Sequence, residues 1–349
     1  MMPIPTRPGT AVSNNNRVGR YYLVREIGRG SFGTVYVARD PVIDRNVAIK
    51  TRNAGPSAVG NKQAEAQFIN EARAAGRLNH PNIITIFDAS NEGGAIFIAM
   101  EYLQGSELSK LLDAGTHFST MDTLGICWKL ADALAHAHKN GVVHRDINPS
   151  NIFMLADNQP KIFDFGIARA PNRLQDQHSD EDDAPFTLFQ DNLIGTPNYM
   201  SPEQATGRQV DHLTDIYSLG AVMYEMLTQR KPFQSETTEK LLEAIAHKAP
   251  PSPIEINTTV PLGLSQIVMK AMSKRPEKRY QSAQEMAQDI DNFMNLEKLR
   301  SVRATGPFSS PEPELDAEPA IPSSMNSSVV KAAIGLIAVA AAGTYYWFH

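Results

Sequence analysis

Residues 144–166 read HRDINPSNIFMLADNQPKIFDFG, and no other part of the sequence says more about the architecture. The stretch follows a long predicted helix and sets polar residues at fixed spacing, with Asp146 five positions before Asn151 and eighteen before Asp164. Strand-like runs dominate the chain before Gly105, and helix-like runs dominate after it. A small β-rich lobe followed by a large helical lobe predicts a two-lobed α+β architecture.

The β-rich part spans residues 21–103. It holds short runs rich in Val, Ile and Tyr, bounded by Gly, Pro and Asp, over Tyr22–Ile27, Thr34–Arg39 and Asn46–Thr51. One helix is predicted between these runs and Gly105, over residues 64–78, where apolar residues recur at helical spacing. Further helices are predicted over 121–139, 213–229, 262–272 and 282–294.

A glycine-rich segment, Gly28-Arg29-Gly30-Ser31-Phe32-Gly33, lies between the first two strand-like runs. A dinucleotide-binding fold would need a helix after these glycines, but an extended pattern follows them. The segment therefore predicts a β-hairpin, whose glycines would let backbone amides approach phosphate oxygens. Two alternatives stay open at this point: a hairpin without a ligand, and a solvent-facing role for Lys50 in the third run.

The composition is that of a globular protein. Of the 349 residues, 42% are hydrophobic and 20% are charged, which fits a sizeable buried core. The formal net charge of -5 provides no bulk positive charge for binding nucleic acid. The single cysteine, Cys127, excludes an internal disulfide and favours a reducing compartment.

Three segments flank the globular region, which is predicted over residues 21–295. Residues 1–20 lack the apolar run of a signal peptide and are predicted to be flexible. Residues 296–328 are rich in Pro, Ser and acids, which is typical of a linker. Residues 329–348 carry one charge, Lys331, and as a helix would span roughly 30 Å, the thickness of a bilayer core. They predict a single-pass transmembrane helix; a helix docked on the globular region is the alternative.

Several motifs occur in a fixed order along the chain. They are GRGSFGTV at 28–35, VAIK at 47–50, Glu71 in the predicted helix, HRDINPSN at 144–151, DFG at 164–166 and GTPNYMSPE at 195–203. With this set the chain resembles the eukaryotic-like (Hanks-type) protein kinases, most closely their bacterial serine/threonine members. The resemblance implies the two-lobed protein kinase fold and ATP-dependent transfer of the γ-phosphate to Ser or Thr hydroxyls of protein substrates, including autophosphorylation.

The resemblance also implies catalytic roles. Lys50 would hold the α- and β-phosphates and pair with Glu71. Asp164 and Asn151 would bind Mg²⁺, or Mn²⁺ in its place, through hard oxygen ligands. Asp146 would accept the proton of the substrate hydroxyl.

The ATP site implied by the resemblance draws on both lobes. Met100 would be the gatekeeper, and the backbone of Glu101 and Leu103 would bond the adenine edge. Glu107 would lie near the ribose hydroxyls, with an ordinary exposed acid as the alternative. The predicted ATP-binding set is Gly28, Gly30, Ser31, Gly33, Val35, Ala48, Lys50, Met100, Glu101, Leu103, Glu107 and Phe153.

One catalytic position departs from the family pattern. Two residues after the catalytic Asp, serine/threonine members carry a lysine, and this chain has Asn148. An amide brings no charge to the γ-phosphate, and losing one preorganised stabiliser costs about 10²–10³ in rate. Two hypotheses follow: an active kinase whose turnover Asn148→Lys would raise, or a membrane-anchored pseudokinase that binds nucleotide or partners. The intact catalytic residues favour the enzyme, and Thr196, whose hydroxyl is expected to reach Asp146, favours Ser/Thr substrates.

The remaining motif residues are expected to be structural. His144 would pack on the 164–166 turn, Glu203 would pair with Arg279, and Asp215 would cap backbone amides near the catalytic loop. The predicted transmembrane helix would hold the kinase domain on the cytoplasmic side of the cell membrane and contact the lipid bilayer. The sequence defines no oligomeric state.

Overall fold

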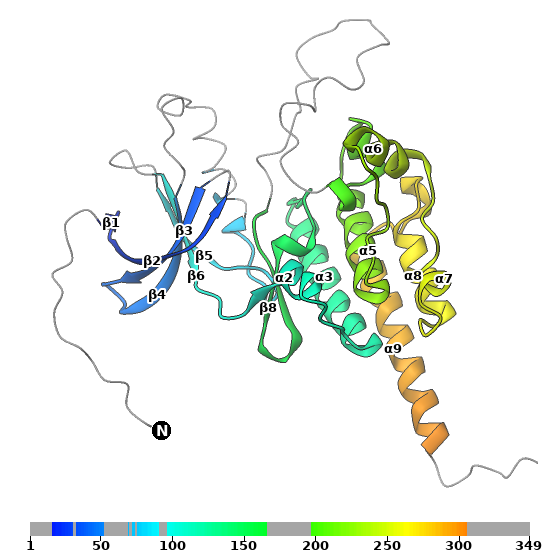
Figure 1. The fold of residues 1–349 in the computed structure, drawn as a ribbon. Helices are drawn as coiled ribbons and strands as arrows, with labels where there is room; N and C mark the ends of the chain where they lie inside the picture. Colours follow the sequence, from blue (N-terminus) through cyan, green and yellow to red (C-terminus); the bar gives the residue numbers. More distant parts are fainter. Residues whose placement is uncertain are drawn as a thin grey trace, which may run out of the picture. The chain divides into compact units, whose positions relative to one another are not determined.

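The computed structural model describes residues 16–30, 33–51, 69, 72–73, 75–90, 96–165 and 197–305. The described residues divide into two units, one up to Leu299 and one from Arg300 onward. The first unit contains a β-sheet lobe followed by a helical lobe, as the sequence predicts (Figure 1).

The N-terminal lobe is built on one antiparallel sheet with strand order β1-β2-β3-β4-β6-β5. Its strands are β1 (Arg17–Val18), β2 (Tyr21–Gly30), β3 (Gly33–Asp40), β4 (Arg45–Thr51), β5 (Ile86–Ser90) and β6 (Phe97–Glu101). The predicted hairpin is confirmed, because β2 and β3 pair antiparallel and their register closes with Gly30 opposite Gly33. The helix predicted over 64–78 is described only in part; Ile69, Ala72, Arg73 and Ala75 are helical.

Alternation along the strands gives this sheet two different faces. Val47 and Ile49 on β4 are fully buried and pack with Tyr21, Phe97 and Ala99 on one face. The rings of Tyr21 and Phe97 meet edge to face, with centroids 5.8 Å apart. Because side chains alternate along a strand, the residues between them point to the opposite face, where the motif residues of β3 and β4 lie.

The helical lobe is organised around α5, all of whose residues are buried. A helix that is buried on every side needs neighbours on every side, and α3 and α8 lie directly against α5 (Figure 1). The helices are α2 (Leu108–Asp113), α3 (Thr120–Lys139), α4 (Pro202–Ala205), α5 (Leu213–Thr228), α6 (Thr238–His247), α7 (Pro253–Ile256), α8 (Leu262–Ala271) and α9 (Ala283–Thr305). The four helices predicted after Gly105 are confirmed within one or two residues at every end except that of α9.

A second, three-stranded sheet pairs a short strand before α2 with two strands of the stretch 144–166. It has the order β7-β8-β9, with β7 at Ser106–Glu107, β8 at Ile152–Leu155 and β9 at Gln159–Ile162. The sequence analysis did not predict this sheet, because its strands are short and β9 contains Pro160. The sheet matters for function because its β8–β9 hairpin connects Asn151 to Asp164.

α9 continues to Thr305, past residue 295 where the globular region was predicted to end. Leu, Glu, Lys and Arg dominate residues 296–300, and these are good helix formers, so the helix propagates into the predicted linker. No helix in the described part of the chain is long and apolar enough to cross a membrane. Residues 329–348, the predicted transmembrane helix, lie outside the described residues.

Candidate active site

The sheet register brings the predicted ATP-binding residues of β3, β4 and β6 to one face. Val35 lies opposite Lys50, and Ala48 lies opposite Met100. Directly opposed residues share a face of an antiparallel pair, and residues two apart on one strand share it too. Val35, Ala48, Lys50 and Met100 therefore line the face opposite to the packed core of this lobe.

Lys50 reaches from this face to the other lobe. Its ammonium forms an ion pair with Oδ1 of Asp164, and the lysine side chain is only 13% exposed. The pair joins residues 114 positions apart and places the predicted phosphate-binding lysine against the predicted metal-binding carboxylate. Glu71, the other predicted partner of Lys50, lies outside the described residues, as do Ser31 and Thr196.

The loop between α3 and β8 gathers the remaining catalytic residues. Asn151 donates through Nδ2 to the backbone oxygen of Asp146 at 2.8 Å and to its carboxylate Oδ2 at 3.0 Å. Asn148 donates through Nδ2 to the same backbone oxygen at 3.0 Å, and its Oδ1 accepts the N–H of Ser150 at 2.9 Å. Two side-chain amides thus fix the backbone carbonyl of Asp146, and Asn151 also holds its carboxylate.

Asp164 is held beside this loop by the residues on either side of it in the chain, Phe163 and Phe165. The N–H of Phe163 donates to the backbone oxygen of Asn151 at 3.1 Å. The ring of His144 contacts Phe163 O through Nε2 at 3.1 Å and packs on Phe165 with centroids 4.7 Å apart. The expected packing of His144 is confirmed, and Asp146, Asn151 and Asp164 come together in one place.

Asp215 supports the loop from α5. Its carboxylate, which is fully buried, accepts the N–H of His144 at 2.8 Å and that of Arg145 at 2.7 Å, so the predicted capping is confirmed. His138 adds a third contact to this carboxylate at 2.8 Å. Arg145 has φ of 65° and Asp164 has φ of 61°, a left-handed backbone conformation that residues other than glycine rarely adopt. The carboxylate of Asp215 offsets this strain at Arg145 by binding its N–H.

The segment after β6 leads from the first lobe to the second. Gly105 has φ of 157°, and a Cβ at this position would come within 2.0 Å of the backbone oxygen of Met154. Only glycine therefore lets this segment pass so close to β8. Phe153 lies opposite Glu107 in the small sheet, and Glu107 pairs with Lys110 at 2.8 Å. The predicted adenine and ribose residues Leu103, Glu107 and Phe153 thus lie on adjoining segments.

The side chain of Glu101 has partners that the sequence analysis did not identify. Its Oε1 accepts from the ammonium of Lys161 and from the N–H of Thr85, both at 2.7 Å. No local sequence pattern predicts this contact, because Lys161 lies 60 positions away on β9.

Glu203 and Arg279 form the predicted ion pair, with both nitrogen–oxygen distances at 2.7 Å. Burial alone would raise the pKa of Glu203, but the hydrogen bonds and charge of Arg279 outweigh it and the pKa is lowered. Thr214 donates to the same carboxylate at 2.7 Å, so the buried charges have full sets of partners. The pair fixes the end of the GTPNYMSPE motif to the helical lobe.

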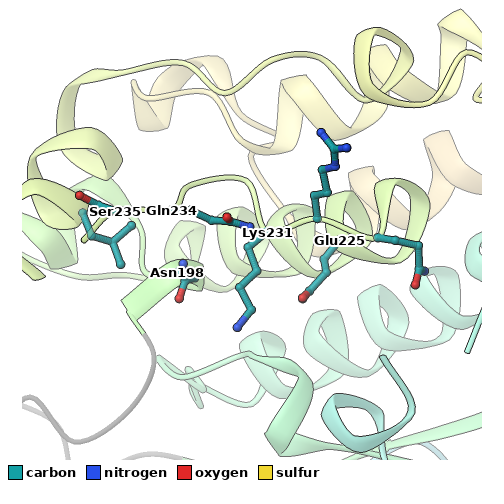
Figure 2. A pocket seen from close by; sticks show the side chains of 8 residues that line it. Asn198, Glu225, Lys231, Gln234 and Ser235 are labelled. Atoms are coloured by element: carbon teal, nitrogen blue, oxygen red, sulfur yellow. The ribbon is translucent and has the colours of Figure 1, made fainter. Parts of the chain in front are cut away.

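A cavity of about 390 Å³ lies beside Pro197–Tyr199 on the helical lobe and is lined by none of the predicted site residues. Figure 2 shows that Glu225 and Lys231 extend to the same side of this region. The hydroxyl of Tyr199 donates to the carboxylate of Glu225. Burial raises the pKa of Glu225, against the lowering effect of Tyr199 and Lys231. Sequence reasoning did not find this pair.

The residues around Asp164 fit a hard divalent cation. Asn151 uses its amide nitrogen on Asp146, which leaves its amide oxygen for a ligand. Asp164 uses Oδ1 on Lys50, and no hydrogen bond from the described residues occupies its Oδ2. One amide oxygen and one carboxylate oxygen, completed by water and phosphate oxygens, suit Mg²⁺.

The chain is similar to known proteins over most of its length. A family model described as "Protein kinase domain" matches residues 21–290. A probable serine/threonine-protein kinase of Clostridium acetobutylicum is 36% identical over 288 residues, which cover 82% of this chain and 41% of that protein. Serine/threonine-protein kinase PrkC of Bacillus subtilis is 35% identical over 287 residues, covering 82% and 42%. The chain thus spans about two-fifths of the length of these curated relatives.

Solved structures share the fold. The kinase domain of PknI from Mycobacterium tuberculosis superposes with a TM-score of 0.60 at 23% identity and covers 81% of this chain and 99% of that domain. At this level of identity the likeness concerns the fold alone.

Proposed function

The chain belongs to the protein kinase family, and from that premise we propose that it is an ATP- and Mg²⁺-dependent protein serine/threonine kinase. The observation that carries the proposal is the meeting of Lys50 with Asp164 beside the Asp146–Asn151 loop. Phosphoryl transfer demands positioning and charge stabilisation more than covalent chemistry, and this arrangement supplies both.

The contacts of each residue support a proposed role. Lys50 would bind the α- and β-phosphates, since its ammonium lies on the inner face of β4 and is mostly shielded from water. Asn151 and Asp164 would hold Mg²⁺, which when bound neutralises charge on the β- and γ-phosphates. Asp146, oriented by Asn151, would accept the proton of a Ser or Thr hydroxyl on a protein substrate.

Two observations argue against the pseudokinase alternative. The relatives carry the names of serine/threonine-protein kinases. Asn148 also takes part in the catalytic loop, because it fixes the carbonyl of Asp146 and the start of the 3₁₀ helix η2 (Pro149–Asn151). The side chain of Asn148 thus holds the catalytic loop in place without the charge that a lysine would bring to the γ-phosphate.

The experiment that tests the proposal is incubation of the full chain with ATP, Mg²⁺ and a generic basic protein substrate, followed by mass spectrometry. We expect phosphoserine or phosphothreonine on the substrate and on the chain itself, as autophosphorylation would give. Asp146→Asn keeps the shape of the loop but removes the base, and should abolish both products. Phosphate transfer at an equal rate by this variant would overturn the assignment.

We also infer that residues 329–348 anchor the kinase domain to the cytoplasmic face of a membrane. The support is their length, their single charge at Lys331 and the aromatic run Tyr345–Phe348, which is typical of a membrane interface. The test is fractionation of cells that express the full chain. Release into the soluble fraction without detergent would contradict the anchor and leave the kinase assignment untouched.

A further inference from the structure

The segment 82–85 is hydrogen-bonded to strands of both lobes. On one side, Ile84 donates its N–H to Ile162 O at 2.9 Å, and Ile162 donates its own N–H to Asn82 O at 2.8 Å. On the other side, Glu101 donates its N–H to Thr85 O at 2.9 Å. The segment thus lies between β9 of the helical lobe and β6 of the sheet lobe and is hydrogen-bonded to both.

An ion pair bridges the same junction directly. Lys161 on β9 donates to Oε1 of Glu101 at the end of β6 at 2.7 Å, and to Ile83 O at 3.4 Å. The two side chains are only 13% and 23% exposed, whereas Lys110 in the nearby pair with Glu107 is 65% exposed. Charge-assisted hydrogen bonds shielded from water are the strong ones, so the Lys161–Glu101 contact resists displacement far better than a surface pair.

Both ends of this ion pair adjoin the nucleotide site. Glu101 follows Met100, which lies opposite Ala48 on the ATP-facing side of the sheet. Lys161 precedes Asp164 by three residues, and Asp164 pairs with Lys50. We propose that Lys161 and the side chain of Glu101 form a positioning pair that fixes the spacing between the adenine-binding strand and the metal-binding carboxylate.

The inference rests on the proposed function, because it takes the site to hold a nucleotide and a metal. A nucleotide with phosphates and Mg²⁺ must satisfy the adenine strand and Asp164 at once, so its affinity depends on the spacing between them. Adenosine touches the adenine strand and has no phosphate or metal to bring to Asp164. The positioning pair therefore contributes to the binding of ADP with Mg²⁺ and contributes little to the binding of adenosine.

The test is calorimetric titration of the full chain with ADP plus Mg²⁺ and, separately, with adenosine. We expect Lys161→Met to weaken ADP–Mg²⁺ binding about tenfold and adenosine binding less than about twofold, as the loss of one shielded charge-assisted hydrogen bond predicts. Lys161→Arg, which keeps a cationic donor, should recover most of the affinity for ADP–Mg²⁺. Glu101→Gln removes the negative charge from the pair and keeps an acceptor for the N–H of Thr85. It should also weaken ADP–Mg²⁺ binding more than adenosine binding, and it serves as the test variant if Lys161→Met does not fold.

A matched control is Lys270→Met, because the Lys270–Glu285 pair at 3.0 Å lies wholly within the helical lobe. It should change neither affinity. Unchanged ADP–Mg²⁺ binding by folded Lys161→Met would overturn the inference, and so would equal weakening of both ligands, which a general loss of stability produces. A wild-type chain that binds neither ligand would instead refute the proposed function.

Discussion

Replacing Asn148 tests how the catalytic loop works without the family's lysine. The side chain makes two hydrogen bonds, one to the backbone oxygen of Asp146 at 3.0 Å and one from the N–H of Ser150 at 2.9 Å. The second caps the 3₁₀ helix η2, and each bond contributes about 1 kcal/mol to stability. Asn148→Ala should therefore lower the free energy of unfolding by about 2 kcal/mol.

Asn148→Lys removes the same two hydrogen bonds and adds a cation. A preorganised charge at the γ-phosphate is worth roughly 3–4 kcal/mol in the transition state. If the two lost hydrogen bonds weakened the transition state by their full value of about 2 kcal/mol, the added charge would still leave it about 1–2 kcal/mol more stable. That difference is roughly tenfold in kcat. We therefore expect Asn148→Lys to melt at a lower temperature than wild type and to turn over about ten times faster.

The assay is steady-state phosphate transfer at saturating ATP, run beside thermal unfolding without nucleotide. Asn148→Asp is the matched variant, because it keeps the acceptor for Ser150 and loses the donor to Asp146. It should melt above Asn148→Ala and have the lowest turnover of the three, since it puts a second negative charge beside Asp146. An Asn148→Lys variant with unchanged or lower kcat would refute the reasoning and show that the loop geometry outweighs the added charge.

Three further outcomes follow from the structure. Arg279→Met leaves the carboxylate of Glu203 buried without its cation and should lower the free energy of unfolding by about 3–5 kcal/mol, as measured by denaturant titration. A loss below about 1 kcal/mol would contradict a buried ion pair between these two residues. The pKa of Glu203 is lowered in the folded state, so its stabilising contribution is complete above its ordinary value of 4.5 and disappears as pH falls through the lowered pKa. The difference in melting temperature between wild type and Glu203→Gln should accordingly be constant at neutral pH and shrink below about pH 4.5, and a difference that grows in acid would reverse the sign argued here. Gly105→Ala should destabilise the fold severely and prevent nucleotide binding, because its Cβ would meet Met154 O at 2.0 Å. Gly115 has φ of 75° and open space around it, so Gly115→Ala should lower the free energy of unfolding by only about 1 kcal/mol. Equal shifts in melting temperature for the two variants would refute the close approach at Gly105.

The sequence was most informative where short motifs have a local structural meaning. The extended pattern after Gly33 predicted a hairpin in place of a strand–helix unit, and β2 and β3 confirm it. The order of motifs predicted that Asp146, Asn151 and Asp164 belong to one site, and the hydrogen bonds of Asn151 and Phe163 bring them together.

Some side-chain contacts were not predictable from the sequence. The sequence showed that Asn148 replaces a lysine, but its two hydrogen bonds depend on the conformation of residues 146–150. The contact of Lys161 with Glu101 joins strands in different lobes, so no hydrophobic periodicity or motif spacing in the sequence predicts it. The strands of the small sheet are too short for an alternation pattern, and they form because Gly105 lets the segment pass close to β8.

The most direct test of the central claim is a crystal structure of the full chain with a non-hydrolysable ATP analogue and Mn²⁺ in place of Mg²⁺. Anomalous scattering locates the metal independently of the protein coordinates. The account predicts Mn²⁺ on the oxygens of Asn151 and Asp164, with the phosphates against Lys50 and the adenine beside Met100. Manganese and nucleotide bound elsewhere, for example in the cavity beside Tyr199, would contradict it.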